Sequence, residues 1–432
     1  MFALDSEKYD VIVIGGGPAG STLASLLAKA DRKVLLLEKE KFPRYHVGES
    51  LVPGVMPILE ELGIQETIAS YGFRKKNGIT LVWGRNREPW TVTFDEASPG
   101  EGGYSHAYQV VRSEFDNLLL RHAQHMGVIV REGYKVTEVI QHKGRAVGVK
   151  YQAKDSEFIG EAYASYVVDA TGQTALIGNQ FKLVEIDSKL KNVATWTYFE
   201  DVEQYEAEIA GNILTEHTPY GWVWIIPQHT GKTSIGWVAP SNKYKKLLES
   251  ESSIEKAYTK VLNATVESRR RLQNAHRVKD EPLRSIRDWS YKCNKFYGSG
   301  YLLVGDAAGF VDPLFSTGVF LAMNGGSFGA KMLDQALAEP QREQEFFSRY
   351  ENAYKAFLDK VTSFVHFFYD ASLELEEYFN EAKDLIDPID RMTARQDFVY
   401  LISGLAGINL LERIDAKNVK QLAFSESSPI KS

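Results

Sequence analysis

The stretch YDVIVIGGGPAG, residues 9–20, decides the fold of this 432-residue chain. Its apolar first half, residues 9–14, predicts a short buried strand that ends at the glycines. Residues 21–30 are rich in Leu and Ala and predict a helix, and residues 33–38, KVLLLE, predict a second strand that ends in an acid. A strand, a glycine-rich loop, a helix and a second strand together indicate a Rossmann-type unit.

The glycines of this stretch fill the dinucleotide-binding pattern G-x-G-x-x-G. The first glycine permits the tight turn, the second lets the backbone approach a pyrophosphate, and the third lets the helix pack closely on the strand. The helix N-terminus would bind the phosphates, and the acid at the end of the second strand would bind the ribose hydroxyls. The predicted cofactor contacts here are Gly15, Gly17, Pro18, Ala19, Gly20 and Glu38. The pattern alone does not separate NAD from FAD.

A second candidate cofactor segment lies near residue 300. Residues 300–309, GYLLVGDAAG, predict a strand that runs into a turn of small residues, with Asp306 at the end of the strand. From there the Asp306 carboxylate can accept a hydrogen bond from a ribityl hydroxyl of a flavin. Residues 320–323 then open a helix, and N–H groups at a helix start suit an anion or the pyrimidine edge of a flavin. This second segment favours FAD.

In combination, these segments resemble the flavoprotein monooxygenase superfamily, whose founding member hydroxylates p-hydroxybenzoate. The family's middle motif corresponds to VDATG at 168–172, between the glycine loop and the late Gly-Asp motif. The resemblance also assigns Arg112, in QVVRSEFD at 109–116, as a flavin-contacting arginine. It implies an α/β fold with a Rossmann-type FAD-binding domain like that of p-hydroxybenzoate hydroxylase, and it spans residues 9 to about 325.

The sequence GWVWIIP, residues 221–227, contains W-x-W-x-I-P and resembles the motif of flavin-dependent halogenases. Trp222 and Trp224 are two positions apart, so on a strand they point to the same face. A packed aromatic strand would also explain them. In the halogenase family the pair lies beside the tunnel between flavin and substrate, and its proposed role is to prevent direct oxygen transfer to the substrate. Related geranylgeranyl reductases have Tyr at the first position, so Trp222 points to a halogenase.

Two segments upstream resemble the halogenase branch that acts on phenols and pyrroles. The first is FPRYHVGESL, residues 42–51, which related reductases share in part and which would bring Arg44 and Ser50 to the cofactor. The second is GFRKKNGITLVWG, residues 72–84. Lys76 there fits the catalytic lysine that the branch carries ahead of a Trp-Gly strand. Lys75 stays open as an alternative, although on an extended segment it should face the other way.

The resemblance gives this lysine and the following motif their chemistry. Hypohalous acid formed at the flavin would pass to Lys76, which acts either as an ammonium that hydrogen-bonds the acid or as a neutral amine that forms a haloamine. Burial lowers a lysine pKa and would favour the second route, but the sequence does not decide between them. The halide site of the family corresponds to Thr317 and Gly318, next to the flavin contact Val319. Backbone N–H groups at a helix start suit chloride or bromide.

Phe315 bears on the substrate. Tryptophan halogenases have a glutamate at this place, where it assists catalysis, and their chains are longer than this one. Both departures argue against free tryptophan and fit the branch that halogenates electron-rich phenols or pyrroles. The acid or base that would take up the ring proton is not identifiable from the sequence.

The predicted organisation has three parts. Residues 193–199, 223–226 and 232–238 are β-branched and aromatic runs that predict a substrate-side sheet. Aromatic and apolar residues between Phe347 and Phe368 recur at steps of one, three and four, which predicts an amphipathic helix packed on the core. We therefore expect an FAD-binding domain at 1–75, 105–180 and 280–335, an inserted antiparallel substrate-side sheet at 76–104 and 181–279, and a C-terminal helical region at 336–432.

Composition excludes several function classes. The net charge of −7 does not suggest a nucleic-acid binder. Cys293 is the one cysteine, so no disulfide forms within the chain, and we expect a cytoplasmic location. No signal peptide and no run of 18 apolar residues is visible. The nine histidines are scattered and no Cys-x-x-Cys occurs, so no metal site is predicted.

The sequence therefore predicts an FADH2- and O2-dependent halogenase of an electron-rich aromatic ring, using chloride or bromide. A single dinucleotide loop leaves no place for NAD(P)H, so a separate flavin reductase would supply FADH2. The substrate could be tethered to a carrier protein, as for some family members. Three alternatives stay open: a geranylgeranyl reductase-type enzyme, an aromatic hydroxylase, and a non-enzymatic flavin-binding protein.

Overall fold

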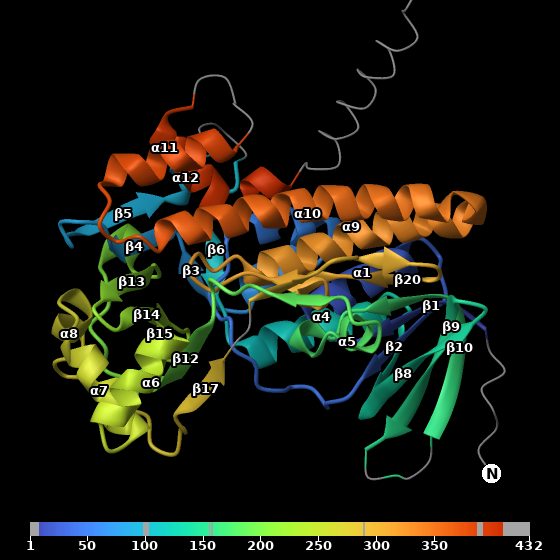
Figure 1. The fold of residues 1–432 in the computed structure, drawn as a ribbon, viewed down its shortest axis with the longest axis horizontal. Coiled ribbons are helices and arrows are strands. Elements are labelled where there is room, and N and C mark those ends of the chain that lie inside the picture. Colours follow the sequence, from blue (N-terminus) through green and yellow to red (C-terminus); the bar gives the residue numbers. More distant parts are fainter. Residues whose placement is uncertain are drawn as a thin grey trace, which may run out of the picture.

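A computed structural model describes residues 8–97, 103–154, 156, 159–287, 290–386 and 392–408. The molecule is elongated, with one sheet at each end (Figure 1). The long helix α10 (Glu343–Phe368) runs along one side and reaches from one end to the other. The cofactor motifs lie in the half built around β1, and the tryptophan motif lies in the half built around β14.

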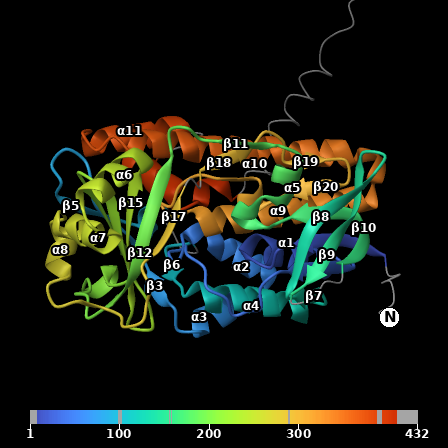
Figure 2. The ribbon, with the colours of Figure 1, turned by 60° about the horizontal axis from the view of Figure 1, so that its bottom comes forward.

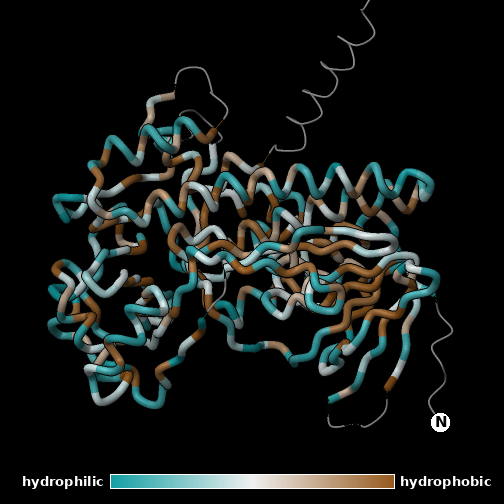
Figure 3. The backbone as a smooth tube through the Cα atoms, in the orientation of Figure 1, coloured by the Kyte–Doolittle hydropathy of each residue, from teal (hydrophilic) through white to brown (hydrophobic). Residues whose placement is uncertain are grey.

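The first sheet contains the predicted Rossmann unit. Its strands β20, β10, β1, β2 and β7 pair in parallel, in that order. The central strands are apolar over most of their length (Figure 3), as expected for a parallel sheet covered on both faces. The strands of this sheet are β1 (Tyr9–Ile14), β2 (Val34–Glu38), β7 (Ile129–Glu132), β8 (Tyr134–His142), β9 (Arg145–Ala153), β10 (Ile159–Asp169), β19 (Tyr297–Gly298) and β20 (Tyr301–Leu303). The predicted strands and the glycine loop between them are confirmed.

Helices cover this sheet. Helix α1 packs against both α9 and α4, and the hairpin of β8 and β9 extends beyond the sheet at one end (Figure 2). The helices of this half are α1 (Pro18–Lys29), α2 (Met56–Leu62), α3 (Gln65–Ser70), α4 (Arg112–His125), α5 (Leu176–Gln180) and α9 (Gly318–Ala338). Two small sheets complete it, one of β11 (Val184–Ile186), β18 (Tyr291–Cys293) and β21 (Gly309–Phe310), and one of β3 (Arg74–Lys76) and β6 (Ala107–Gln109).

The second sheet has the order β16-β12-β15-β14-β13-β4-β5, with β17 also paired to β12. It was predicted to be antiparallel, and its pairs are antiparallel except for β13 and β4, which run parallel. Strand β17 belongs to this sheet, so the boundary predicted at residue 280 falls inside it. The strands are β4 (Gly78–Val82), β5 (Pro89–Thr93), β12 (Asn192–Glu200), β13 (Ile213–Thr218), β14 (Gly221–Pro227), β15 (Thr233–Pro240), β16 (His276–Arg277) and β17 (Arg284–Arg287).

The two faces of β14 have different neighbours, because side chains alternate along a strand. Val223 and Ile225 join a separate apolar cluster with Trp237 and with residues of α6 and α7. Trp222 and Trp224 face the other way, into the main core. The helices on the outer face are α6 (Ser241–Ser250), α7 (Ile254–Asn263) and α8 (Glu267–Arg271). The sheet therefore turns both motif tryptophans toward the FAD half of the molecule.

The C-terminal helices close the structure. Helix α10 buries the predicted aromatic face, from Phe347 to Phe368, as a continuous stripe. Helices α11 (Leu375–Leu385) and α12 (Ala394–Ile402) pack against each other beside its end (Figure 1). The last part of the predicted helical region, 409–432, lies outside the described residues. Among the described residues, no helix is both long and apolar enough to cross a membrane.

Candidate active site

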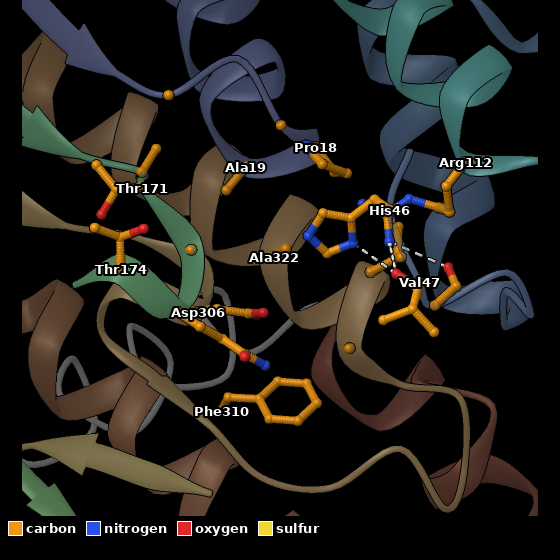
Figure 4. A pocket seen from close by; sticks show the side chains of 18 of the residues that line it. Pro18, Ala19, His46, Val47, Arg112, Thr171, Thr174, Asp306, Phe310 and Ala322 are labelled. Carbon is orange, nitrogen blue, oxygen red and sulfur yellow. Dashed lines mark hydrogen bonds between the residues drawn. The ribbon is translucent and has the colours of Figure 1, made fainter. Parts of the chain in front are cut away.

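One cavity of about 900 Å³ joins the cofactor motifs to the tryptophan motif. Its lining begins at the glycine loop and at β8, passes the segment 44–50 and Asp306, and ends at the β-sheet with Trp222 and Trp224. In the close view, Pro18 and Ala19 lie across the cavity from Asp306 and Phe310 (Figure 4). Motifs that are more than 200 residues apart in the sequence therefore share one continuous space.

The three glycines of the loop differ in the structural reason for the absence of a side chain. Gly15 has φ +105°, and a Cβ there would lie 2.4 Å from the carbonyl oxygen of Ala170. A Cβ on Gly20 would lie 2.0 Å from the Gly15 oxygen, so this glycine serves the packing of α1 on the strand, and it does not line the cavity. Gly17 has an ordinary φ of −72°, and a Cβ there would meet only the Arg44 Nη2 atom at 3.5 Å.

The protein itself therefore does not require a glycine at position 17. A ligand that approaches the backbone at the N-terminus of α1 would require one, as the pyrophosphate of a dinucleotide does. Pro18 and Ala19 occupy the first turn of α1 and also line the cavity. This cradle fits the diphosphate of FAD.

Glu38 lies at the end of β2 and lines the cavity. Its Oε2 atom accepts a hydrogen bond from the backbone N–H of Gly16 at 2.7 Å, and its Oε1 atom accepts one from the backbone N–H of Glu40 at 2.8 Å. Each carboxylate oxygen can accept a further bond, so ribose hydroxyls can still be bound. Glu38 thus also fixes the glycine loop, which the sequence did not indicate.

Arg112 lines the cavity as the first residue of α4 (Figure 4). Its Nε and Nη2 atoms donate to both oxygens of Asp116, at 2.7 and 2.9 Å, and its Nη1 atom donates to the carbonyl oxygen of Val47 at 2.7 Å. Burial alone would raise the pKa of Asp116, but the Arg112 guanidinium lowers it below its usual value. Arg44 also donates to Asp116, at 3.0 Å. Both predicted arginines therefore hold the segment 44–50 at the cavity.

Asp306 lies at the opposite wall (Figure 4). Burial raises the pKa of Asp306 to about 7, and the charge of Arg112 opposes this rise. Helix α9 begins close by, at Gly318, and both Gly318 and Val319 line the cavity. Thr317 precedes the helix as its N-cap residue and is buried behind this surface. Of the two predicted halide residues, only Gly318 reaches the cavity.

Trp222 and Trp224 form the far wall of the cavity. Their ring centroids are 6.0 Å apart, and Trp196 of β12 lies 6.4 Å from Trp224. The Trp224 indole donates to the Ser234 hydroxyl at 3.2 Å, and the Trp222 indole donates to the Tyr369 hydroxyl at 3.0 Å. Three tryptophans thus separate the cavity from the sheet, and Trp196 was missed because it lies in another strand.

Lys76, at the end of β3, is completely buried and does not line the cavity. Its Nζ atom donates to the Ser50 hydroxyl at 2.9 Å and to the Leu51 carbonyl oxygen at 2.8 Å. Burial lowers the pKa of Lys76 from 10.5 to about 7. Lys75 is exposed, which agrees with the predicted alternation along the strand. Ser50 does line the cavity, so it connects the buried amine to the cofactor space.

Phe315 is buried in an aromatic cluster and not open to the cavity. Its ring stacks on Phe364 at 5.3 Å and contacts Phe368 at 4.8 Å. The sequence predicts that the aromatic face of α10 packs on the core, and the family resemblance implies that some of Phe364, Phe367, Phe368 and Tyr369 line the substrate site. In the described residues, Phe364 and Phe368 pack into this cluster, as core packing predicts.

Glu49 is a cavity-lining residue that sequence reasoning missed, although it lies within the quoted segment 42–51. Its Oε1 atom accepts hydrogen bonds from Tyr198 and Gln228, both at 2.6 Å. Burial raises the pKa of Glu49, and hydrogen bonds from Tyr198, Ser234 and Gln228 oppose the rise. Its partners come from the second sheet, so only the tertiary structure reveals this contact.

Comparison with known proteins agrees with this geometry. The family model described as tryptophan halogenase matches residues 10–102 and 95–400. A protein of Chondromyces crocatus named tryptophan 2-halogenase is 31% identical over 419 residues, covering 95% of this chain and 78% of that protein. The 1H-pyrrole-2-carbonyl-[peptidyl-carrier protein] brominase of Pseudoalteromonas luteoviolacea is 34% identical over 335 residues, covering 77% of this chain and 78% of that protein.

A solved structure shares the whole architecture. The myxobacterial chondrochloren halogenase CndH, an FAD-dependent halogenase, superposes with a TM-score of 0.79 and 33% identity, covering 93% of this chain and 97% of that one. The predicted α/β fold with a Rossmann-type FAD-binding part is thereby confirmed, as is the predicted family. This chain belongs to the tryptophan halogenase family of flavin-dependent halogenases, enzymes that use FAD, O2 and a halide.

Proposed function

We propose that this enzyme halogenates an electron-rich aromatic ring, a phenol or a pyrrole, and that Lys76 relays the oxidised halide to it. When bound, FADH2 would supply the two electrons that let O2 oxidise the halide, so that FADH2, O2, one halide and one proton give FAD, hypohalous acid and water. The observation that carries the proposal is the buried amine of Lys76, hydrogen-bonded at 2.9 Å to Ser50 on the cavity wall.

The position of Lys76 is costly for the fold. Burial without a carboxylate partner disfavours the charged form of Lys76, so its pKa falls to about 7. The amine donates to two neutral oxygens, the Ser50 hydroxyl and the Leu51 carbonyl. A strongly perturbed lysine beside a cofactor cavity is a good candidate for a functional group. We infer that near neutral pH it can act as ammonium or as amine.

The cavity wall formed by Trp222 and Trp224 favours a relay through Lys76 over direct transfer of oxygen from the flavin to the substrate. The rings of Trp222 and Trp224 occupy one wall of the cavity, which leaves less room for a substrate ring directly against the flavin. This argument disfavours the aromatic hydroxylase, in which substrate lies against the flavin. A small diffusing oxidant could pass where an aromatic ring could not, and Lys76 would hold it for reaction.

The environment of Phe315 supports an activated ring as substrate. The ring of Phe315 stacks among Phe364 and Phe368, which leaves no acidic side chain at the position where tryptophan halogenases carry a glutamate. An electron-rich phenol or pyrrole needs less assistance in losing its ring proton than tryptophan does. One relative is named for tryptophan and another for a carrier-bound pyrrole. The substrate panel should therefore include all three ring types.

The proposed partners follow from the same reasoning. We propose that a separate flavin reductase supplies FADH2. A pyrrole or phenol bound to a carrier protein as a thioester is the second proposed partner, because one relative carries that substrate in its name.

The test uses the full chain with FAD, a flavin reductase, NADH and either chloride or bromide. The panel contains a free phenol, a free pyrrole, tryptophan and a pyrrole-2-carbonyl carrier protein. We expect a halogenated phenol or pyrrole, free or carrier-bound, whose formation stops in Lys76→Met while FADH2 is still oxidised. Halogenation of tryptophan alone would refute the proposed substrate class, and full activity of Lys76→Met would refute the relay.

A further inference from the structure

A buried polar network lies where the two halves of the molecule and the end of α10 meet. Its members are Asn192, Trp222, Asp312 and Tyr369, and they come from four separate parts of the chain. Asn192 is the first residue of β12, Trp222 lies in β14, Asp312 follows β21, and Tyr369 directly follows α10 as its C-cap residue. None of the roles assigned above to the cofactor or to Lys76 uses this network.

The Tyr369 hydroxyl is the centre of the network. It accepts hydrogen bonds from the Trp222 indole at 3.0 Å and from the Asn192 amide at 2.9 Å. It donates its own proton to Oδ2 of Asp312 at 3.0 Å. One donor and two lone pairs are all that a phenol offers, so the hydrogen bonds of Tyr369 are complete. Burial and the nearby Asp312 carboxylate raise the pKa of Tyr369 well above its ordinary value, so the phenol stays protonated.

Asn192 closes the network. Its amide donates one proton to Tyr369 and the other to Oδ2 of Asp312, at 3.1 Å. The second oxygen of Asp312 accepts the backbone N–H of Leu314 at 3.1 Å, within the loop that leads to Gly318. The network therefore fixes the Trp222 ring and the loop before α9 at the same time. In a buried site such a complete network holds its members in one arrangement.

The end of α10 is held in a second place as well. The Trp83 indole donates to the carbonyl oxygen of Phe368 at 2.8 Å, one residue before Tyr369. Tyr369 therefore lies on a fixed helix end, and its hydroxyl orients Trp222 from outside the sheet.

On this geometry we propose that Tyr369 is a positioning residue that holds the Trp222 ring in place on the cavity wall, so that oxidised halide formed in the cavity is retained until it reacts. The inference rests on the proposed function, since it concerns how oxidised halide reaches Lys76 without loss. Removal of the hydroxyl leaves the Trp222 indole N–H without its acceptor, whereas Asn192 and Asp312 keep the hydrogen bond to each other. The Trp222 ring then gains freedom, and hypohalous acid escapes before it reaches the substrate.

The first measurement reads the position of Trp222 without any turnover. The full FAD-loaded chain is labelled with indole-¹⁵N tryptophan, which gives seven signals, one for each tryptophan. Trp222→Phe and Trp83→Phe assign the two relevant signals. In Tyr369→Phe we expect the Trp222 indole proton to exchange with solvent at least about tenfold faster, because its acceptor is gone. The Trp83 proton should exchange at its wild-type rate, since its acceptor is a backbone oxygen.

The second measurement reads the consequence for catalysis. The halogenated product formed per FADH2 oxidised should fall about tenfold in Tyr369→Phe, while the rate of FADH2 oxidation and the affinity for FAD stay within about twofold. Tyr350→Phe is the matched control, because Tyr350 is also buried in α10 and donates one hydrogen bond to the Leu303 carbonyl oxygen at 3.0 Å. It should retain wild-type coupling of FADH2 oxidation to product.

The outcomes separate cleanly. Faster exchange at Trp222 together with lost coupling supports the proposal. Unchanged exchange at Trp222, equal losses in Tyr369→Phe and Tyr350→Phe, or faster exchange with unchanged coupling each overturn it. If the wild type halogenates no ring in the panel, the proposed function fails. The exchange measurement alone then decides whether Tyr369 fixes Trp222.

Discussion

The amine of Lys76 donates a hydrogen bond to the hydroxyl of Ser50 at 2.9 Å. Lys76 ends β3, whereas Ser50 belongs to the segment that lines the FAD cavity. The contact joins a buried amine to the cofactor space through one hydroxyl. It therefore offers a short route from that space to the proposed relay.

Charge and nucleophilicity at Lys76 can be separated by substitution. Lys76→Arg keeps a cation that cannot lose its proton, and Lys76→Met keeps only the apolar length. We expect Lys76→Met to lose at least about 100-fold in halogenation while FADH2 oxidation continues, as for loss of a group that acts in the chemical step. In the wild type, the pH profile of the halogenation rate should show a limb, a rise or a fall centred near pH 7, the pKa of Lys76. This limb should be absent from the profile of Lys76→Arg.

The direction of that limb identifies the active form of the lysine. A rate that rises with pH assigns the role to the neutral amine, and a rate that falls assigns it to the ammonium. Persistence of the limb in Lys76→Arg would show that another group titrates. Asp306 is the first to examine in that event, because burial raises its pKa to about 7 as well.

Stability should depend on pH through the same residue. The pKa of Lys76 is about 7 in the fold and 10.5 for an unperturbed lysine, so the unfolded chain binds more protons between these values. The free energy of unfolding must then rise with pH across this window, and the destabilisation is fully present below pH 7. The full pKa shift corresponds to a destabilisation of the fold by roughly 5 kcal/mol. The two hydrogen bonds that the Lys76 amine makes in the fold, and that Lys76→Met would lose, offset part of this cost.

We accordingly expect Lys76→Met to be more stable than the wild type at pH 7, by about 2 kcal/mol. This difference in the free energy of unfolding should narrow as the pH approaches 10. Denaturant unfolding of both proteins at several pH values measures it. A variant that is less stable than the wild type at pH 7 would contradict the desolvation argument.

Two glycines of the dinucleotide loop should respond differently to alanine. At Gly17 the backbone φ is ordinary and a Cβ meets only Arg44 Nη2, at 3.5 Å. Gly17→Ala should therefore fold normally but bind FAD at least about tenfold more weakly, because the methyl group would occupy the space of the diphosphate. At Gly20 a Cβ would lie 2.0 Å from the Gly15 oxygen. Gly20→Ala should destabilise the apoprotein by several kcal/mol, roughly the cost of overpacking a core.

Flavin fluorescence titration and thermal unfolding of the apoproteins distinguish the two variants. Unchanged FAD affinity in Gly17→Ala would mean that the diphosphate lies elsewhere than on α1.

Trp222 should matter for coupling and not for flavin oxidation. In Trp222→Ala we expect FADH2 oxidation to stay within about twofold, and halogenated product to fall about tenfold, because the wall of the cavity opens. Trp237→Phe is the control, since Trp237 lies in the adjacent strand and packs on Tyr244 at the outer face. Product quantification against FADH2 consumed is the measurement. A Trp222→Ala enzyme with wild-type product yield would leave the tryptophan motif with only a packing role.

Much of the FAD site could be predicted because its signals are local. The glycine loop, Glu38 and Asp306 each lie at the end of a predicted strand, and parallel strands bring such ends to one edge. The alternation of Lys75 and Lys76 likewise follows from the strand itself. The burial of Thr317 behind the cavity wall and the contacts of Glu49 did not follow, because each depends on neighbours far away in the sequence.

The sequence by itself determined the family and the cofactor and singled out Lys76 as the lysine proposed for the relay, since these depend on motifs whose spacing is set by single strands and helix starts. Only the tertiary structure decided that Lys76 is fully buried against Ser50 and that Tyr369 orients Trp222. The physical reason is that burial and hydrogen-bond partners are properties of packed neighbours. Strand β3 reaches Ser50, and β14 reaches Tyr369 after α10, only when the whole chain has folded.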